Sequence, residues 1–86
     1  MPAAAESESH RSRELFARNL RAARYRAGFS QERLSALARL HRTEISLLER
    51  GERDPRLSTV FRLADALGVP AGALLAPEDS EVSRDR

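Results

Sequence analysis

Apolar and polar residues recur at helical spacing along most of the chain, and no segment alternates in the manner of a strand. The pattern is densest near the middle. Leu34 and Ala38 stand four apart there and share one helix face behind Ser30, whose hydroxyl can cap the first turn. Ile45 and Leu48 share the face of a second helix. The few residues between leave room only for a sharp corner, so this stretch is predicted to form two short helices joined by a tight turn.

Three more helices are predicted around this pair. The first is capped by Ser12 and stopped by Gly28, and its apolar face repeats at Phe16, Leu20, Ala23 and Ala27. A later helix ends at Gly68, and its apolar face has the i, i+3, i+4, i+7 spacing of Val60, Leu63, Ala64 and Leu67. Pro70 opens a last short helix that reaches Ala76 at most. The predicted fold class is therefore all-α, with five helices in one compact domain.

The two ends of the chain lack this periodicity. Residues 1–12 are small and polar and are predicted to be a mobile, disordered arm, residues 13–76 form the folded domain, and residues 77–86 are predicted to be a disordered charged tail. A chain of 86 residues holds one apolar core. The longest apolar run, residues 71–76, is too short to cross a bilayer, so we expect no membrane association and a cytoplasmic location.

The composition argues against a chemical or metal centre. The chain has no cysteine, and its two histidines are His10 and His41. It also has no glycine-rich loop that would cradle a phosphate and no pair of acids in an evident pocket. We therefore expect no enzyme activity, no cofactor and no metal.

The charge is unevenly distributed along the chain. The net charge is +2, but residues 11–56 hold twelve arginines against six acidic residues, whereas the segments on either side are each net negative. Such a basic excess on the first three helices favours a surface that binds a polyanion.

The second helix of the central pair has a face with no core to cover. Counting 100° per residue from Ile45, the opposite side carries Thr43, Ser46, Leu47 and Arg50. An apolar inner face and a polar, arginine-bearing outer face on two helices joined by a tight turn are typical of a helix-turn-helix motif.

With these residues placed, the chain resembles the phage repressor and Cro family of DNA-binding domains, the Xre-like group. The resemblance covers about residues 13–76 and is carried by Gly28-Phe29-Ser30-Gln31, Leu34, Ala38, Ile45-Ser46, Leu48-Glu49-Arg50-Gly51, Arg53-Asp54-Pro55, Leu57-Ser58-Thr59-Val60 and residues 63–69. The run 40–46, followed by Glu49-Arg50-Gly51, also looks like the controller proteins of restriction-modification systems. The resemblance implies a lambda-repressor-like five-helix domain that places residues 41–50 in the major groove.

The implied base-reading residues lie at the start and on the outer face of that helix. Side chains there can reach the donor and acceptor pattern that the major groove presents for each base pair. We expect Arg42 to contact guanine or a phosphate, Thr43 to contact a base edge or a thymine methyl group, Glu44 to accept from cytosine, and Leu47 to touch a thymine methyl group.

Other residues are expected to bind backbone phosphates or to hold the helices together. Gln31 matches the family position that contacts phosphate, and the further phosphate-binding candidates are Arg50, Arg53, Arg18, Arg21 and Arg39. Glu49 lies on the inward arc of its helix and needs a partner. The family pairs the positions of Arg24 and Glu49, so an ion pair between the first helix and the reading helix is implied. Arg39 also stands where the family usually has glycine, so an arginine with a left-handed backbone conformation is expected at the turn. Arg56 stands where the family often has serine, which leaves the cap of the fourth helix open.

The function predicted on these grounds is that of a sequence-specific transcriptional regulator. It would bind double-stranded DNA as a homodimer on a pseudo-palindromic operator. Adjacent Leu74 and Leu75 cannot share a helix face, so one is expected in the core and the other in a dimer interface, unless both fold back on the core. The alternative is an antitoxin or adaptor whose main partner is another protein, bound through the last helix or the C-terminal tail.

Overall fold

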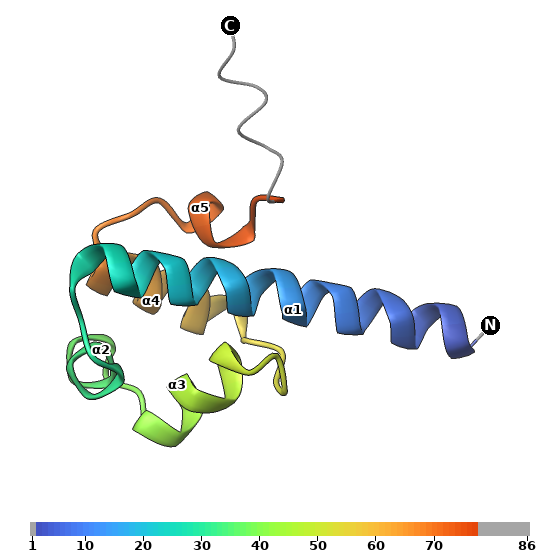
Figure 1. Cartoon of the computed structure of the whole chain (residues 1–86), viewed down its shortest axis with the longest axis horizontal. Helices are drawn as coiled ribbons and strands as arrows, with labels where there is room; N and C mark the ends of the chain where they lie inside the picture. Colours follow the sequence, from blue (N-terminus) through green and yellow to red (C-terminus); the bar gives the residue numbers. More distant parts are fainter. Residues whose placement is uncertain (1, 78–86) are drawn as a thin grey trace, which may run out of the picture.

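The computed structural model describes residues 2–77, and the side chains of residues 8–77. In this range the chain forms five helices and no strand: α1 (Pro2–Ala27), α2 (Gln31–Ala38), α3 (Arg42–Glu49), α4 (Leu57–Leu67) and α5 (Ala71–Leu75). The all-α fold with five helices is confirmed, and α2 to α5 lie where the sequence pattern predicts them (Figure 1). The tail predicted over residues 77–86 lies, beyond Pro77, outside the described residues.

The start of α1 was predicted wrongly. The helix begins at Pro2 and not after Ser12, so the mobile arm expected over residues 1–12 is a helix from residue 2 onward. The prediction relied on an apolar stripe, which a helix needs only where it packs on a core. Residues 3–5 are alanines, which have the highest helix propensity, and proline is favoured in the first turn.

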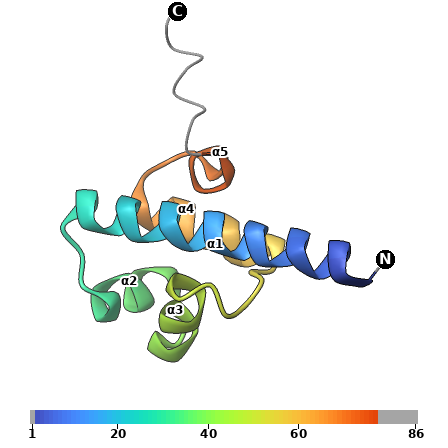
Figure 2. The same cartoon turned by 45° about the vertical axis from the view of Figure 1, so that its right-hand side comes forward.

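The helices are arranged around α1. Figures 1 and 2 show α2 and α3 on one side of α1, α5 on the opposite side and α4 behind it, with the N-terminal part of α1 projecting beyond the other helices. Residues 8–12 are all exposed, which agrees with this projection. The part of α1 from Arg13 onward therefore supports the rest of the domain.

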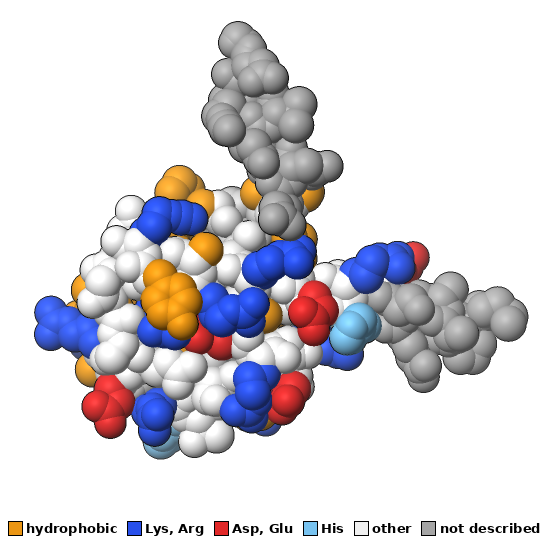
Figure 3. Space-filling view, in the orientation of Figure 1, with side chains coloured by type: hydrophobic (Ala, Val, Ile, Leu, Met, Phe, Trp, Pro, Cys, Tyr) orange, Lys and Arg blue, Asp and Glu red, His pale blue; other side chains and the backbone are white. Residues whose placement is uncertain are grey.

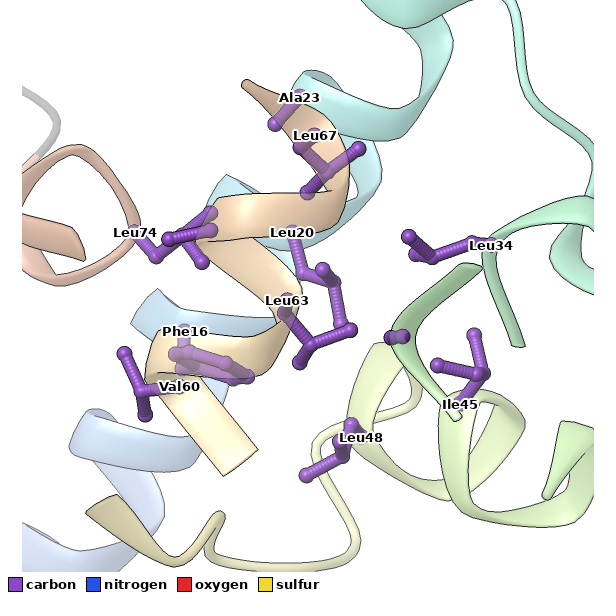
Figure 4. Packing of buried hydrophobic residues seen from close by; sticks show 12 residues of the cluster. Phe16, Leu20, Ala23, Leu34, Ile45, Leu48, Val60, Leu63, Leu67 and Leu74 are labelled. Carbon is purple, nitrogen blue, oxygen red and sulfur yellow. The ribbon is translucent and has the colours of Figure 1, made fainter. Parts of the chain in front are cut away.

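All five helices contribute to one hydrophobic core. Figure 4 shows Leu20 of α1 and Leu63 of α4 near its centre, facing Leu34 of α2 and Ile45 and Leu48 of α3. These five side chains are fully buried, and each such burial stabilises the fold by roughly 1.5–3 kcal/mol. Two of them belong to α3, so the core fixes which side of this short helix faces outward.

The helix boundaries show how the chain turns between α2 and α3. The Ser30 hydroxyl accepts a hydrogen bond from the backbone N–H of Arg33 at 3.0 Å, so the predicted cap is present. Arg39 ends α2 in the left-handed conformation, with φ 60° and ψ 46°, and it has the only positive φ of a non-glycine residue among those described. This conformation costs a non-glycine residue about 1–2 kcal/mol, which the packing of the motif offsets.

The last helix separates two adjacent leucines. Leu74 is fully buried in the core, whereas Leu75 is 48% exposed. One leucine is thus in the core and the other exposed, as expected, and Leu74 is excluded as a dimer-interface residue because the domain itself covers its side of α5. Asn19 of α1 holds this helix in place by donating to the carbonyl oxygens of Leu74 and Ala76.

No helix within residues 2–77 has the length and apolar character to span a bilayer.

Candidate nucleic-acid interface

One face of α3 belongs to the core and the other is open to solvent. Ile45, Leu48 and Glu49 are buried, with Glu49 only 3% exposed. Arg42 and Thr43, at the start of the helix, are exposed. The N-cap residue His41 makes no side-chain hydrogen bond. The first turn of α3 therefore offers side chains and backbone N–H groups to a ligand.

The outward face of α3 forms a shallow hollow. Arg42, Thr43, Ser46 and Arg50 line a cavity of about 210 Å³. Within the described residues the side chains of Arg42 and Thr43 make no hydrogen bond or ion pair, so both are free for an external partner. Leu47 is half-buried beside them. The base-reading role of these residues stays a prediction, and the structure leaves Arg42 and Thr43 accessible for it.

Glu44 differs from its neighbours in the first turn. Its Oε1 accepts a hydrogen bond from Nη1 of Arg53, which lies in the loop between α3 and α4. The Glu44 side chain is 21% exposed and that of Arg53 is 51% exposed. Two residues that were expected to contact DNA separately, one at a base and one at a phosphate, are therefore paired with each other.

The remaining arginines lie on a surface of mixed charge. Figure 3 shows arginine side chains spread over one face of the molecule, with acidic side chains beside several of them. Arg50 donates to Oγ of Ser46 at 2.6 Å and lies 3.3 Å from a carboxylate oxygen of Glu52. Arg18 and Arg39 are both exposed. An arginine that is already paired with a neighbouring side chain is less available to an external anion than an unpaired one.

A buried network ties the start of the motif to the end of α3. Arg24 and Glu49 form a two-pronged ion pair, with Nε–Oε2 at 2.6 Å and Nη2–Oε1 at 2.9 Å. Arg24 also donates to the backbone oxygen of Phe29 at 2.8 Å and lies over the Tyr25 ring, 4.7 Å from its centroid. The hydrogen bond with Glu49 raises the pKa of the Arg24 guanidinium, although burial opposes the rise. The ion pair implied by the resemblance is present and links α1 to α3.

Two residues expected at DNA phosphates belong to this network. Gln31 donates its side-chain amide to Oε1 of Glu49 at 3.0 Å. Arg21 donates from Nη1 to the backbone oxygen of Glu49, at the C-terminal end of α3, where a cation also complements the helix dipole. The i, i+3 spacing of Arg21 and Arg24 on α1 is the sequence signal for this role, which the sequence reasoning missed.

The sequence reasoning also missed an exposed apolar surface on α4. Leu57 is 69% exposed and Phe61, one turn later, is 53% exposed. Both lie beside the buried stripe of α4 and do not belong to it. The sequence signal for this surface is Phe61, a large apolar residue outside the i, i+3, i+4, i+7 pattern that faces the core.

A compact α-helical domain with this free, polar second helix is a helix-turn-helix domain, and comparison with known proteins agrees. A family model described as helix-turn-helix matches residues 20–74. Control protein C.SmaI of Serratia marcescens is 43% identical over 63 residues, which cover 73% of this chain and 75% of that protein. The chain belongs to the helix-turn-helix family of DNA-binding transcriptional regulators.

Solved structures show the same relationship. The hypothetical transcription factor NHTF from Neisseria superposes with a TM-score of 0.79 at 38% identity, covering 84% of this chain and 83% of that one. The restriction-modification controller protein C.AhdI from Aeromonas hydrophila gives a TM-score of 0.70 at 35% identity, covering 72% of this chain and 94% of that one.

Proposed function

We propose that this regulator binds a pseudo-palindromic operator as a homodimer and reads its sequence with α3 in the major groove. The observation that carries the proposal is the first turn of α3. Arg42 and Thr43 are exposed there and have no partner among the described residues, while Ile45 and Leu48 anchor the opposite face. Side chains presented from a rigid helix in this manner can reach base edges. We also propose a cytoplasmic location, because a DNA-binding regulator must share a compartment with its DNA.

The proposed dimer uses the exposed apolar residues of the last two helices. Leu75 of α5 is a candidate from the sequence, and the structure adds Leu57 and Phe61 of α4, a helix that packs against α5. Exposed large apolar side chains are typical of protein interfaces. A twofold dimer would present two copies of α3 to half-sites about 34 Å apart. The similarity to C.SmaI and C.AhdI supports a controller role for this dimer.

The residues expected at DNA phosphates divide into surface arginines and residues bonded to Glu49. Arg39, Arg50 and Arg53 lie around α3 and are the proposed phosphate-binding residues, together with Arg18. For Gln31 and Arg21 a phosphate contact would have to coexist with their bonds to Glu49. We therefore assign these two mainly to positioning α3.

Replacing Arg42 or Thr43 with alanine is expected to remove sequence preference. Each change should cost about 1–3 kcal/mol of discrimination at the base pair concerned, because a base-edge contact is lost while phosphate contacts remain. The measurement is selection from a random duplex library at about 150 mM salt, followed by titration of the selected operator. Arg26→Ala, an exposed arginine outside the motif, is the matched control.

Two results would contradict this assignment. If both variants bound the selected duplex as tightly as the parent, residues 42 and 43 would not read bases. If the parent itself enriched no inverted repeat, the proposal of a dimeric, sequence-specific regulator would fail and the antitoxin or adaptor alternative would replace it.

Glu44→Gln is expected to strengthen binding to all duplexes alike. The change releases Arg53 from its ion pair and removes a carboxylate from the side of α3 that would face DNA. One added phosphate contact should steepen the slope of log affinity against log salt concentration by about 0.9. Measuring that slope on operator and random duplexes tests the role. Weaker binding confined to duplexes with cytosine at one position would instead assign Glu44 to base reading.

A further inference from the structure

The C-terminal end of α3 is held both by its own turn and by α1. The last four carbonyl oxygens of a helix have no partner inside the helix. In α3, three of them accept from backbone N–H groups of residues 50–52, at 3.1, 3.0 and 3.2 Å. The fourth, that of Glu49, accepts from the guanidinium group of Arg21 on α1. The end of α3 therefore has no carbonyl group left to satisfy, and its position depends on α1.

Gly51, in this turn, lies directly on α1. It is buried, and its φ of 72° is the left-handed conformation that glycine adopts readily at a helix end. A Cβ atom at this position would lie only 3.1 Å from Oε2 of Glu14. The carbonyl oxygen of Gly51 accepts a hydrogen bond from Nε of Arg13 at 3.2 Å, and Figures 1 and 2 show the chain after α3 passing close to α1. The turn is therefore seated on α1 where the projecting part of that helix ends.

Arg13 contacts the loop after α3 at two points. Besides its bond to Gly51, its Nη1 lies 3.9 Å from Oδ2 of Asp54. This ion pair adds little by itself, because the Asp54 side chain is 65% exposed. The hydrogen bond to Gly51 is better shielded, since the Arg13 side chain is 28% exposed and Gly51 is buried. Between the two contact points lies Arg53, whose guanidinium group pairs with Glu44 in the first turn of α3.

We propose that Arg13 is a positioning residue for DNA recognition, which holds the loop after α3 so that Arg53 reaches Glu44. Arg53 lies between the two anchored residues Gly51 and Asp54, so a shift of the loop on α1 moves its guanidinium group away from α3. The pair with Glu44 in turn restrains the first turn of α3, which carries the proposed base-reading side chains. The effect on recognition rests on the proposed function, whereas the effect of Arg13 on the loop does not.

The first experiment compares backbone amide NMR relaxation in the parent and in Arg13→Ala, both without DNA. The order parameters of residues 51–54 should fall from about 0.85, which is typical of rigid backbone, toward about 0.6, and the amide signal of Glu44 should shift. Arg13→Lys keeps a cationic donor and should recover part of the order. Arg11→Ala removes an exposed arginine from the projecting part of α1 and is the matched control, which should change neither quantity. If Arg13→Ala leaves residues 51–54 and Glu44 as they are in the parent, the proposal is overturned.

The second experiment measures the affinity of the same variants for the selected operator and for random duplexes. Arg13→Ala should lower the ratio of these two affinities by at least about threefold, because the first turn of α3 is no longer held in one arrangement. Arg13→Lys should restore part of the ratio. A role confined to stability would lower both affinities alike through the unfolded fraction, so an unchanged ratio overturns the proposal. A parent without operator preference would refute the proposed function, and the NMR comparison would still decide whether Arg13 positions the loop.

Discussion

Glu49→Ala is expected to lower the free energy of unfolding by about 3 kcal/mol, because it leaves the buried Arg24 guanidinium without its partner. The carboxylate of Glu49 accepts from both Arg24 and Gln31, so one substitution removes bonds to α1 and to the first residue of α2. The loss should appear as a lower midpoint in urea unfolding followed by circular dichroism. Thermal unfolding should show the same order of variants.

Two further variants make this result specific. Glu8→Ala removes an exposed glutamate from the projecting part of α1 and should leave the midpoint unchanged. Replacing both Arg24 and Glu49 with leucine removes the two charges together and should recover much of the loss, since a buried pair is often replaceable by apolar residues. An unchanged midpoint in Glu49→Ala would mean that the pair does not support the fold.

The contribution of Arg24 should not vary with pH near neutrality. Its pKa is raised in the folded state, chiefly by the hydrogen bond with Glu49. A base with a raised pKa stabilises the fold fully below its unfolded pKa and loses that effect only as the pH rises through the folded value. For an arginine both values lie far in the alkaline range, so the guanidinium remains charged wherever the protein is assayed.

Phe61→Asp is expected to abolish the proposed homodimer. An aspartate at this half-exposed position on α4 would have to be buried against the partner without a counter-ion, whereas it stays solvated in the monomer. Loss of the second reading helix should lower affinity for an inverted repeat by about 10²–10⁴-fold while single half-sites are bound as before. Sedimentation gives the oligomeric state, and titration of whole and half operators gives the affinities.

The control for this experiment is Leu37→Asp. Leu37 is also exposed, at 45%, but lies on α2, outside the proposed interface. It should leave the oligomeric state unchanged. If the parent is a dimer and Phe61→Asp is one too, or if Phe61→Asp binds the whole operator as tightly as the parent does, α4 is not the interface.

Local patterns predicted those features that neighbouring residues determine. The spacing of Leu34, Ala38, Ile45 and Leu48 places α2 and α3 because one helix face must be buried. Gly68 ends α4 in the left-handed conformation, as its position suggested. Arg39 shows that a residue other than glycine occupies such a conformation when the surrounding core requires it.

The features that were missed depend on contacts between distant parts of the chain. Gln31 and Arg21 are polar residues at plausible phosphate positions, and only the arrangement of α1, α2 and α3 brings both to Glu49. Likewise, no spacing rule relates Glu44 to Arg53, because their pairing depends on the path of the loop after α3. The sequence also does not say which of Leu74 and Leu75 is buried, because that depends on how the short helix α5 is rotated against the core.

The projecting part of α1 means that one continuous helix does not have one stability. Around Phe16 and Leu20 the core covers the helix, so we expect the amide hydrogens there to exchange with solvent only when the whole domain unfolds. Residues 8–12 are all exposed, so no core protects this part of the helix and it depends on local propensity, which is marginal in water. We therefore expect this part to open and close while the domain remains folded, so that α1 contains two cooperative units with no break in the backbone between them.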